Sequence, residues 1–127
     1  MFTHVMLGMN DLDESKAFYD ATLGTLGIAP GRVDPKGRVI YMNDGGRLLL
    51  TKPIDGQPAC HANGGTIGFA AASAEQVDAW QAAGVANGGT AIEDAPGMRD
   101  AGFGKLYLAY LRDPAGNKVC ALHRVVE

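Results

Sequence analysis

The sequence has few cysteines, no cluster of basic residues and no long hydrophobic run. Its two cysteines, Cys60 and Cys120, form neither a CxxC pair nor a disulfide framework, which indicates reduced thiols. The formal net charge is −3 and no run of lysine or arginine is present, so the chain lacks the basic field that attracts nucleic acid or anionic membranes. The longest apolar runs, such as 48–50 and 67–72, are far below the roughly 20 residues of a membrane helix. We therefore expect neither nucleic acid nor a membrane as a partner.

The N-terminus also lacks the basic start and the small-residue cleavage site of a signal peptide, because a strand-like pattern begins at Phe2. We therefore expect a cytoplasmic protein. The 127 residues include 46% hydrophobic residues and 18 glycines. This length and composition indicate one globular domain, over 1–127, with many tight turns.

One order of elements occurs twice along the chain. Periodicity and turn residues predict a strand, a helix and three short strands in the first half, over 3–9, 12–23, 31–33, 38–42 and 47–52. The second half repeats this order over 66–71, 74–86, 91–93, 105–111 and 118–123. Asn10 and Asp11 are the candidate caps of the first helix, and Ser73 is that of the second. The sequence thus predicts an α+β fold of two βαβββ modules, about 1–56 and 62–127.

Superposing the two predicted modules aligns several residues. His4 falls on Thr66, and Phe18 falls on Trp80. We expect Phe18 and Trp80 each to pack its helix onto the sheet of its own half. The turns before the last strands also correspond, with residues 43–46 in the first half and 113–116 in the second.

Several motifs resemble the vicinal oxygen chelate superfamily, which includes glyoxalase I, bleomycin-resistance proteins and extradiol dioxygenases. They are His4 in the first strand, Lys-Ala-Phe-Tyr at 16–19 followed by Leu-Gly at 23–24, the Asp-Pro-Ala-Gly-Asn-Lys turn at 113–118, and the linker at 52–59. The resemblance implies two curved sheets that enclose a pocket, and a homodimer. It also implies that metal-binding members hold a divalent ion through the first and last strands of each half, where the ion polarises a substrate with adjacent oxygens.

At these four positions the chain matches the metal-binding pattern only once. His4 matches, whereas Thr66, Cys120 and approximately Leu50 stand where ligands are expected. A threonine hydroxyl is a poor metal ligand, and leucine has no donor atom. We therefore expect a degenerate metal site and no cofactor. The alternative is a divalent ion that is held partly by His4. Neither His61, in the linker, nor His123, on the opposite face of the last strand from Cys120, restores the site.

Two functions follow from this resemblance, and a purely structural dimer without a ligand ranks behind both. The first is a binding protein whose pocket captures a small organic ligand, with His4, Met6, Leu50, Thr66 and Cys120 as the expected pocket residues. We expect His4 to point into this cavity, as a hydrogen-bonding or proton-accepting group; a core histidine is the alternative. The second function is a metal-dependent glyoxalase-like lyase, isomerase or dioxygenase. In it His4 is the candidate catalytic residue, Cys120 and a carboxylate such as Glu93 are its candidate partners, and residues 94–103 are a candidate lid over the pocket.

Overall fold

The computed structural model describes residues 1–125 and shows two βαβββ modules that do not close on one another. The first module consists of β1 (Val5–Gly8), α1 (Leu12–Gly24), β2 (Arg32–Val33), β3 (Val39–Asn43) and β4 (Gly46–Thr51). The second consists of β5 (Ile67–Ala70), α2 (Ala74–Ala86), β6 (Thr90–Asp100), β7 (Lys105–Arg112) and β8 (Lys118–Arg124). The predicted α+β class and the repeated order of elements are confirmed. No helix of the described part is long and apolar enough to cross a membrane.

Both helices begin at the side chain of a capping residue. Asp11 accepts a hydrogen bond from the backbone N–H of Glu14 at 2.9 Å, and Ser73 accepts one from Gln76 at 3.1 Å. Each bond satisfies an N–H group that has no partner within its own helix. The neighbouring candidate Asn10 does not cap α1, since its side chain accepts from the backbone N–H of Ala59 in the linker at 2.6 Å.

Each module forms a four-stranded sheet in which the first strand of the module lies at one edge, next to the last strand. The strand order is β1-β4-β3-β2 in the first sheet and β5-β8-β7-β6 in the second. β1 pairs in parallel with β4, and β5 pairs in parallel with β8. The short strands β1 and β5 are therefore edge strands of their sheets, and each leaves one side without a ladder partner in the described chain.

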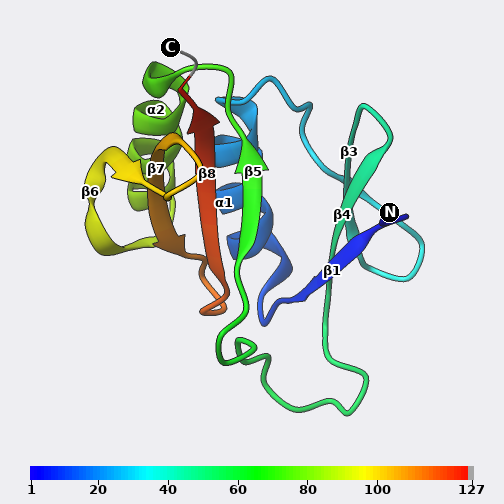
Figure 1. The fold of residues 1–127 in the computed structure, drawn as a ribbon. Helices are drawn as coiled ribbons and strands as arrows, with labels where there is room; N and C mark the ends of the chain where they lie inside the picture. The colour runs from blue at the N-terminus through cyan, green and yellow to red at the C-terminus, as the bar shows by residue number, and fades with distance from the viewer. Residues whose placement is uncertain (126–127) are drawn as a thin grey trace.

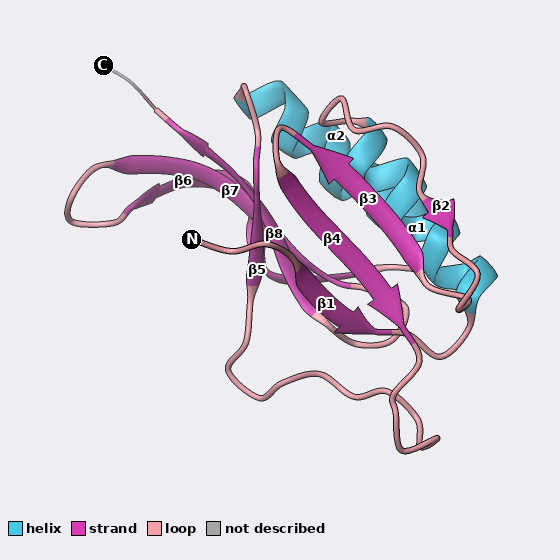
Figure 2. Ribbon diagram, turned by 90° about the vertical axis from the view of Figure 1, so that its right-hand side faces the viewer, coloured by secondary structure: helices cyan, strands magenta, loops and turns pink. Residues whose placement is uncertain are grey.

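The two helices lie side by side rather than each covering only its own sheet (Figures 1 and 2). The ring of Phe18 in α1 lies where side chains at Gly84 and Gly89 of the second module would be. Our expectation that Phe18 packs onto the sheet of its own half was therefore wrong, because the glycines of α2 and its C-terminal turn let the ring cross between the modules. Trp80 is buried as expected, with α2 lying against β7.

A buried polar network links the second module's turn to the first module. The carboxylate of Asp113 accepts hydrogen bonds from the hydroxyl of Tyr19 at 2.6 Å and from both the backbone and the side chain of Asn117. The Asn117 amide also donates to the carbonyl of Gly8, at the end of β1, at 2.9 Å. The motif at 113–117 therefore holds α1 and β1 of the first module against the second.

The strand β6 is much longer than the sequence indicated. We expected a strand only near 91–93 and a lid over 94–103, but β6 continues to Asp100 and pairs with β7 throughout, apart from an irregularity between Ile92 and Gly97. Glu93 has a φ of 59° within this irregularity. The bulge accommodates Pro96, which lacks the N–H of a regular ladder, and this explains why strand-disfavouring residues concealed the strand. The lid prediction was therefore wrong.

Candidate functional site

The described chain contains a cavity of about 510 Å³ between the two modules. The end of α1, the first sheet and the edge strand β5 supply its apolar walls, which consist of Val5, Leu23, Leu26, Ile28, Tyr41, Leu48, Ile67, Phe69 and Ala71. Leu23, Tyr41 and Leu48 are buried, so they form the floor. A concave, mostly apolar space of this size is typical of sites for small organic ligands.

The rim of the cavity is polar, with three exposed residues and one half-buried residue. The hairpin between β3 and β4 contributes Asn43, Asp44 and Arg47, and the first turn of α2 contributes Gln76 from the opposite side. The turn that presents this hairpin is tight, because Asp44 and Gly45 have φ values of 46° and 82°. Two consecutive left-handed residues favour an Asp-Gly pair. The cavity therefore combines an apolar interior with a few polar groups at its rim that can orient a ligand.

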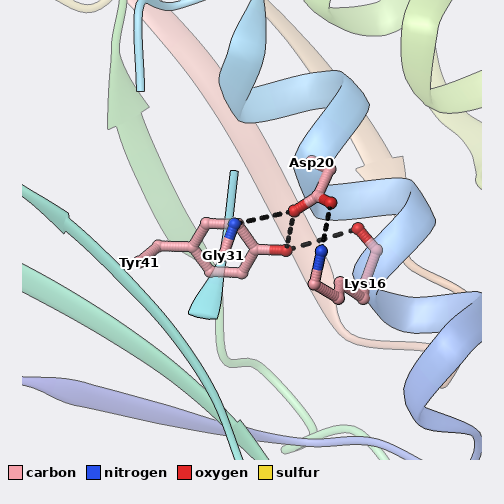
Figure 3. Close-up of polar contacts among 4 residues, drawn as sticks. All are labelled: Lys16, Asp20, Gly31 and Tyr41. Carbon is pink, nitrogen blue, oxygen red and sulfur yellow. Dashed lines mark hydrogen bonds and ion pairs between the residues drawn. The ribbon is translucent and has the colours of Figure 1, made fainter. Parts of the chain in front are cut away.

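A polar cluster fixes Tyr41 in the cavity floor (Figure 3). The Tyr41 hydroxyl donates to Asp20 in α1 at 2.8 Å, and the same carboxylate accepts from Lys16 at 2.6 Å and from the backbone N–H of Gly31 at 2.9 Å. A side chain at Gly31 would meet the ring of Tyr41 and the side chain of Val39 at 2.6 Å, so only glycine permits this close approach. The cluster thereby ties α1, the chain before β2 and β3 into one wall.

The same contacts change the acidity of both partners. Burial, followed by the hydrogen bond and charge of Asp20, raises the pKa of Tyr41 far above its ordinary value, so the phenol stays protonated and donates. Partial burial acts to raise the pKa of Asp20, but the hydrogen bonds from Lys16, Gly31 and Tyr41 outweigh it, and the pKa is lowered from 3.8. Asp20 is therefore charged at neutral pH.

We expect Asp20 to make the fold sensitive to acid. A carboxyl group whose pKa is lower in the folded chain contributes stability that is complete above its unfolded pKa of 3.8 and is lost as the pH falls through the lower folded value. Asp20→Asn should therefore lower the free energy of unfolding at pH 7, and its deficit relative to the native protein should shrink as the pH falls below 3.8. Urea unfolding from pH 7 to pH 2.5 measures both, and a deficit independent of pH would contradict the prediction.

None of the five residues that we expected in the pocket lines this cavity. His4 lies just before β1 and is exposed, with its Nδ1 2.9 Å from the hydroxyl oxygen of Thr3. Met6 is 40% exposed, and Thr66 is exposed just before β5. Their immediate neighbours Val5 and Ile67 line the cavity instead, because successive residues of a strand point to opposite faces. We expected His4 to point into a cavity, but it does not line this cavity between the modules.

The remaining two expected residues lie on different sheets and faces. Leu50 is 1% exposed and belongs to the hydrophobic core. The register pairs Met6 with Leu49 and Leu7 with Leu50, so Leu50 lies on the opposite face of the first sheet from Met6. Cys120 is buried at 6% exposure, on the face of β8 opposite to the core residues Val119 and Ala121.

The residues at the four expected positions do not fit a metal centre. Burial raises the pKa of the Cys120 thiol, which keeps it protonated and a poor ligand at neutral pH. Thr66 offers only a hydroxyl, and Leu50 offers no donor atom. Within residues 1–125, no group of three or more histidine, cysteine, aspartate and glutamate side chains is arranged to hold a metal ion. His61 is exposed in the linker, and the Nδ1 of His123 lies 3.2 Å from the carbonyl of Ala71, on the core side of β8.

The candidate carboxylate Glu93 is engaged elsewhere. It forms an ion pair with Lys118, whose ammonium group lies 4.8 Å from the centre of the Tyr110 ring. Tyr110 is the register partner of Cys120. Glu93 therefore belongs to a group on the outer face of the second sheet, and it does not line the cavity.

Sequence reasoning missed the residues that do line the cavity. Leu26 and Ile28 follow α1 in a stretch without a regular period, and Arg47 and Gln76 belong to different modules. The only available signal was the pair of apolar residues Leu26 and Ile28 that follows the expected end of the helix. Nothing in the local pattern shows that it faces β5.

Comparisons with known proteins agree with this architecture. The sequence profile of the Glyoxalase/Bleomycin resistance protein/Dioxygenase superfamily matches residues 1–121. Among curated proteins, none matches the sequence significantly.

Several solved structures are similar to this chain. A glyoxalase/bleomycin resistance protein from Albidiferax ferrireducens is 63% identical, with a TM-score of 0.94 over 98% of this chain and 99% of the other. A lactoylglutathione lyase from Agrobacterium tumefaciens is 25% identical, with a TM-score of 0.66 over 97% and 92% of the two chains. A glyoxalase/bleomycin resistance protein/dioxygenase family enzyme from Burkholderia phytofirmans is 17% identical, with a TM-score of 0.73 over 97% and 98%, and this likeness concerns the fold alone.

Proposed function

The chain belongs to the Glyoxalase/Bleomycin resistance protein/Dioxygenase superfamily, and from that premise we propose that it is a small-molecule-binding protein without a catalytic metal. The observation that carries the proposal is the cavity of about 510 Å³ between the modules, with apolar walls and a polar rim. Its size suits one organic molecule. The donor atoms at the expected metal positions support binding over lyase or dioxygenase chemistry, although one similar structure is named a lactoylglutathione lyase. A cytoplasmic location is part of the proposal.

Filling the cavity should abolish ligand binding. Leu26 is a partly buried wall residue just after α1, so Leu26→Trp should place an indole in the space that a ligand needs. The probe is N-phenyl-1-naphthylamine, an uncharged dye whose fluorescence rises in apolar surroundings. We expect saturable binding to the native protein and an affinity weaker by about tenfold or more in the variant, which corresponds to about 1.4 kcal/mol.

The matched control is Val85→Trp, because Val85 is a 52% exposed apolar residue of α2 that does not line the cavity. This variant should bind the dye as the native protein does. Thermal melting of both variants establishes that they are folded. A folded Leu26→Trp protein with unchanged dye affinity would contradict the assignment of the cavity as the ligand site.

We also propose that the protein is a homodimer, with a second copy covering the unpaired sides of β1 and β5. Unprotected edges of this kind pair readily with another chain. The outer face of the first sheet also exposes Met6 and Met42, at 40% and 48%. Light scattering at micromolar concentration should give a mass of about twice 13.3 kDa. A stable monomer at that concentration would refute the dimer.

A further inference from the structure

We propose that the ligand of the cavity is an organic anion, whose charged group lies at the rim against Arg47 and the side-chain amide of Gln76. This inference rests on the proposed function, because it names the chemical class of the ligand in the same cavity. Three observations support it: an unpaired cation at the rim, a side-chain donor on the opposite wall, and apolar walls below both.

Arg47 is the cation of the rim. It is exposed in β4, and its side chain forms neither a hydrogen bond nor an ion pair with another described residue. By contrast, Lys16, Arg38 and Lys118 are each paired with a carboxylate. A guanidinium group presents a planar fork of donors that matches carboxylate, sulfonate or phosphate oxygens. Arg47 is therefore a cation available to a ligand at the cavity mouth.

Gln76 faces the same cavity from α2, and its orientation is fixed. Its Oε1 atom accepts a hydrogen bond from the backbone N–H of Ala72 at 2.8 Å, and its backbone N–H donates to the hydroxyl oxygen of the capping residue Ser73. The side-chain oxygen is thus occupied, and the Nε2 amide group is the polar atom left to meet a ligand. An N–H donor on one side and a guanidinium group on the other both favour negative charge between them.

Asp44 is the one carboxylate among the cavity-lining residues, and it opposes an anion. The backbone explains its presence, since φ is 46° at this position and aspartate tolerates the left-handed conformation of a tight hairpin turn. No comparable backbone requirement applies to Arg47 in the regular strand β4. We therefore assign ligand recognition to Arg47 and turn formation to Asp44. The apolar walls require that the remainder of the ligand be hydrophobic.

Two dyes with the same ring system test this assignment. One is the anion 1-anilinonaphthalene-8-sulfonate, and the other is the uncharged N-phenyl-1-naphthylamine. Arg47→Gln should weaken binding of the anion by about fivefold, the range of an exposed ion pair, and leave the neutral dye unchanged. Gln76→Glu keeps an oxygen that can accept from the Ala72 N–H, but it replaces the side-chain N–H donor with a negative charge. It should therefore also weaken binding of the anionic dye and leave binding of the neutral dye unchanged. Asp44→Asn should strengthen binding of the anion.

The control is Arg32→Gln, because Arg32 is an exposed arginine on β2 that does not line the cavity. It should change the affinity for neither dye, and thermal melting should show that all four variants are folded. If the neutral dye binds and Leu26→Trp abolishes its binding, but Arg47→Gln leaves the anion's affinity unchanged, the anion assignment is overturned while the proposed function stands. If Asp44→Asn weakens binding of the anionic dye, Asp44 does not oppose an anion at the rim and the anion assignment is contradicted. If neither dye binds the native protein, both proposals fail together.

Discussion

Replacing Trp80 by alanine is expected to lower the free energy of unfolding by about 3–5 kcal/mol, the usual range for removing a large aromatic side chain from a core. Trp80 is 0% exposed and is the largest of the fully buried side chains in the described chain. It lies on the buried face of α2 with Val77 and Gly84, so its removal leaves a cavity in a close-packed core. Urea unfolding followed by circular dichroism measures the loss.

A second substitution separates packing from polarity at this site. The indole N–H of Trp80 is buried and has no hydrogen-bond partner in the described residues. Trp80→Phe keeps an aromatic ring and removes this unsatisfied donor, so it should cost clearly less than Trp80→Ala. Val85→Ala, at a 52% exposed position of the same helix, should change stability by less than about 0.5 kcal/mol. Equal losses in Trp80→Ala and Val85→Ala would show that α2 does not pack as described.

Asp113→Ala should destabilise the protein by about 3–4 kcal/mol, because it leaves several buried hydrogen-bond donors without an acceptor. Asp113 is 4% exposed, and its carboxylate accepts from the hydroxyl of Tyr19, the backbone N–H of Ala115, and the N–H groups of Asn117. Burial, followed by the charge of Asp113, raises the pKa of Tyr19 well above its ordinary value, so Tyr19 remains protonated and a donor at neutral pH. Equilibrium unfolding at pH 7 measures the effect.

A double-mutant cycle with Tyr19→Phe tests whether this network joins the two modules. Tyr19→Phe alone should cost about 1–2 kcal/mol, because it removes one charge-assisted hydrogen bond and retains the ring. In the Asp113→Ala background it should cost much less, since the partner is already gone. Lys36→Ala, in the exposed turn before β3, serves as a substitution that should be additive with both. Full additivity of Tyr19→Phe and Asp113→Ala would mean that the 2.6 Å contact contributes nothing to stability.

Local pattern was sufficient for most of the fold. Both helices were expected within about one residue of their observed ends, because Asp11 and Ser73 are strong caps and the buried positions recur at helical spacing. The correspondence of Phe18 with Trp80 also held, since both side chains are fully buried. The strand β6 was underestimated, because Pro96 and Gly97 argue against a strand unless a bulge accommodates them.

The sequence by itself determined the duplicated βαβββ order, the helix ends and the hairpin turns, because these depend on side-chain periodicity, capping and backbone preference within a few residues of the chain. Only the tertiary structure decided that Phe18 crosses to Gly84, that Leu49 rather than Leu50 shares the face of Met6, and that Arg47 and Gln76 line one cavity. A strand's register fixes which face each side chain occupies, and one residue of error reverses it. The cavity lies between modules that are distant in sequence, so its lining follows from their packing and not from any local pattern.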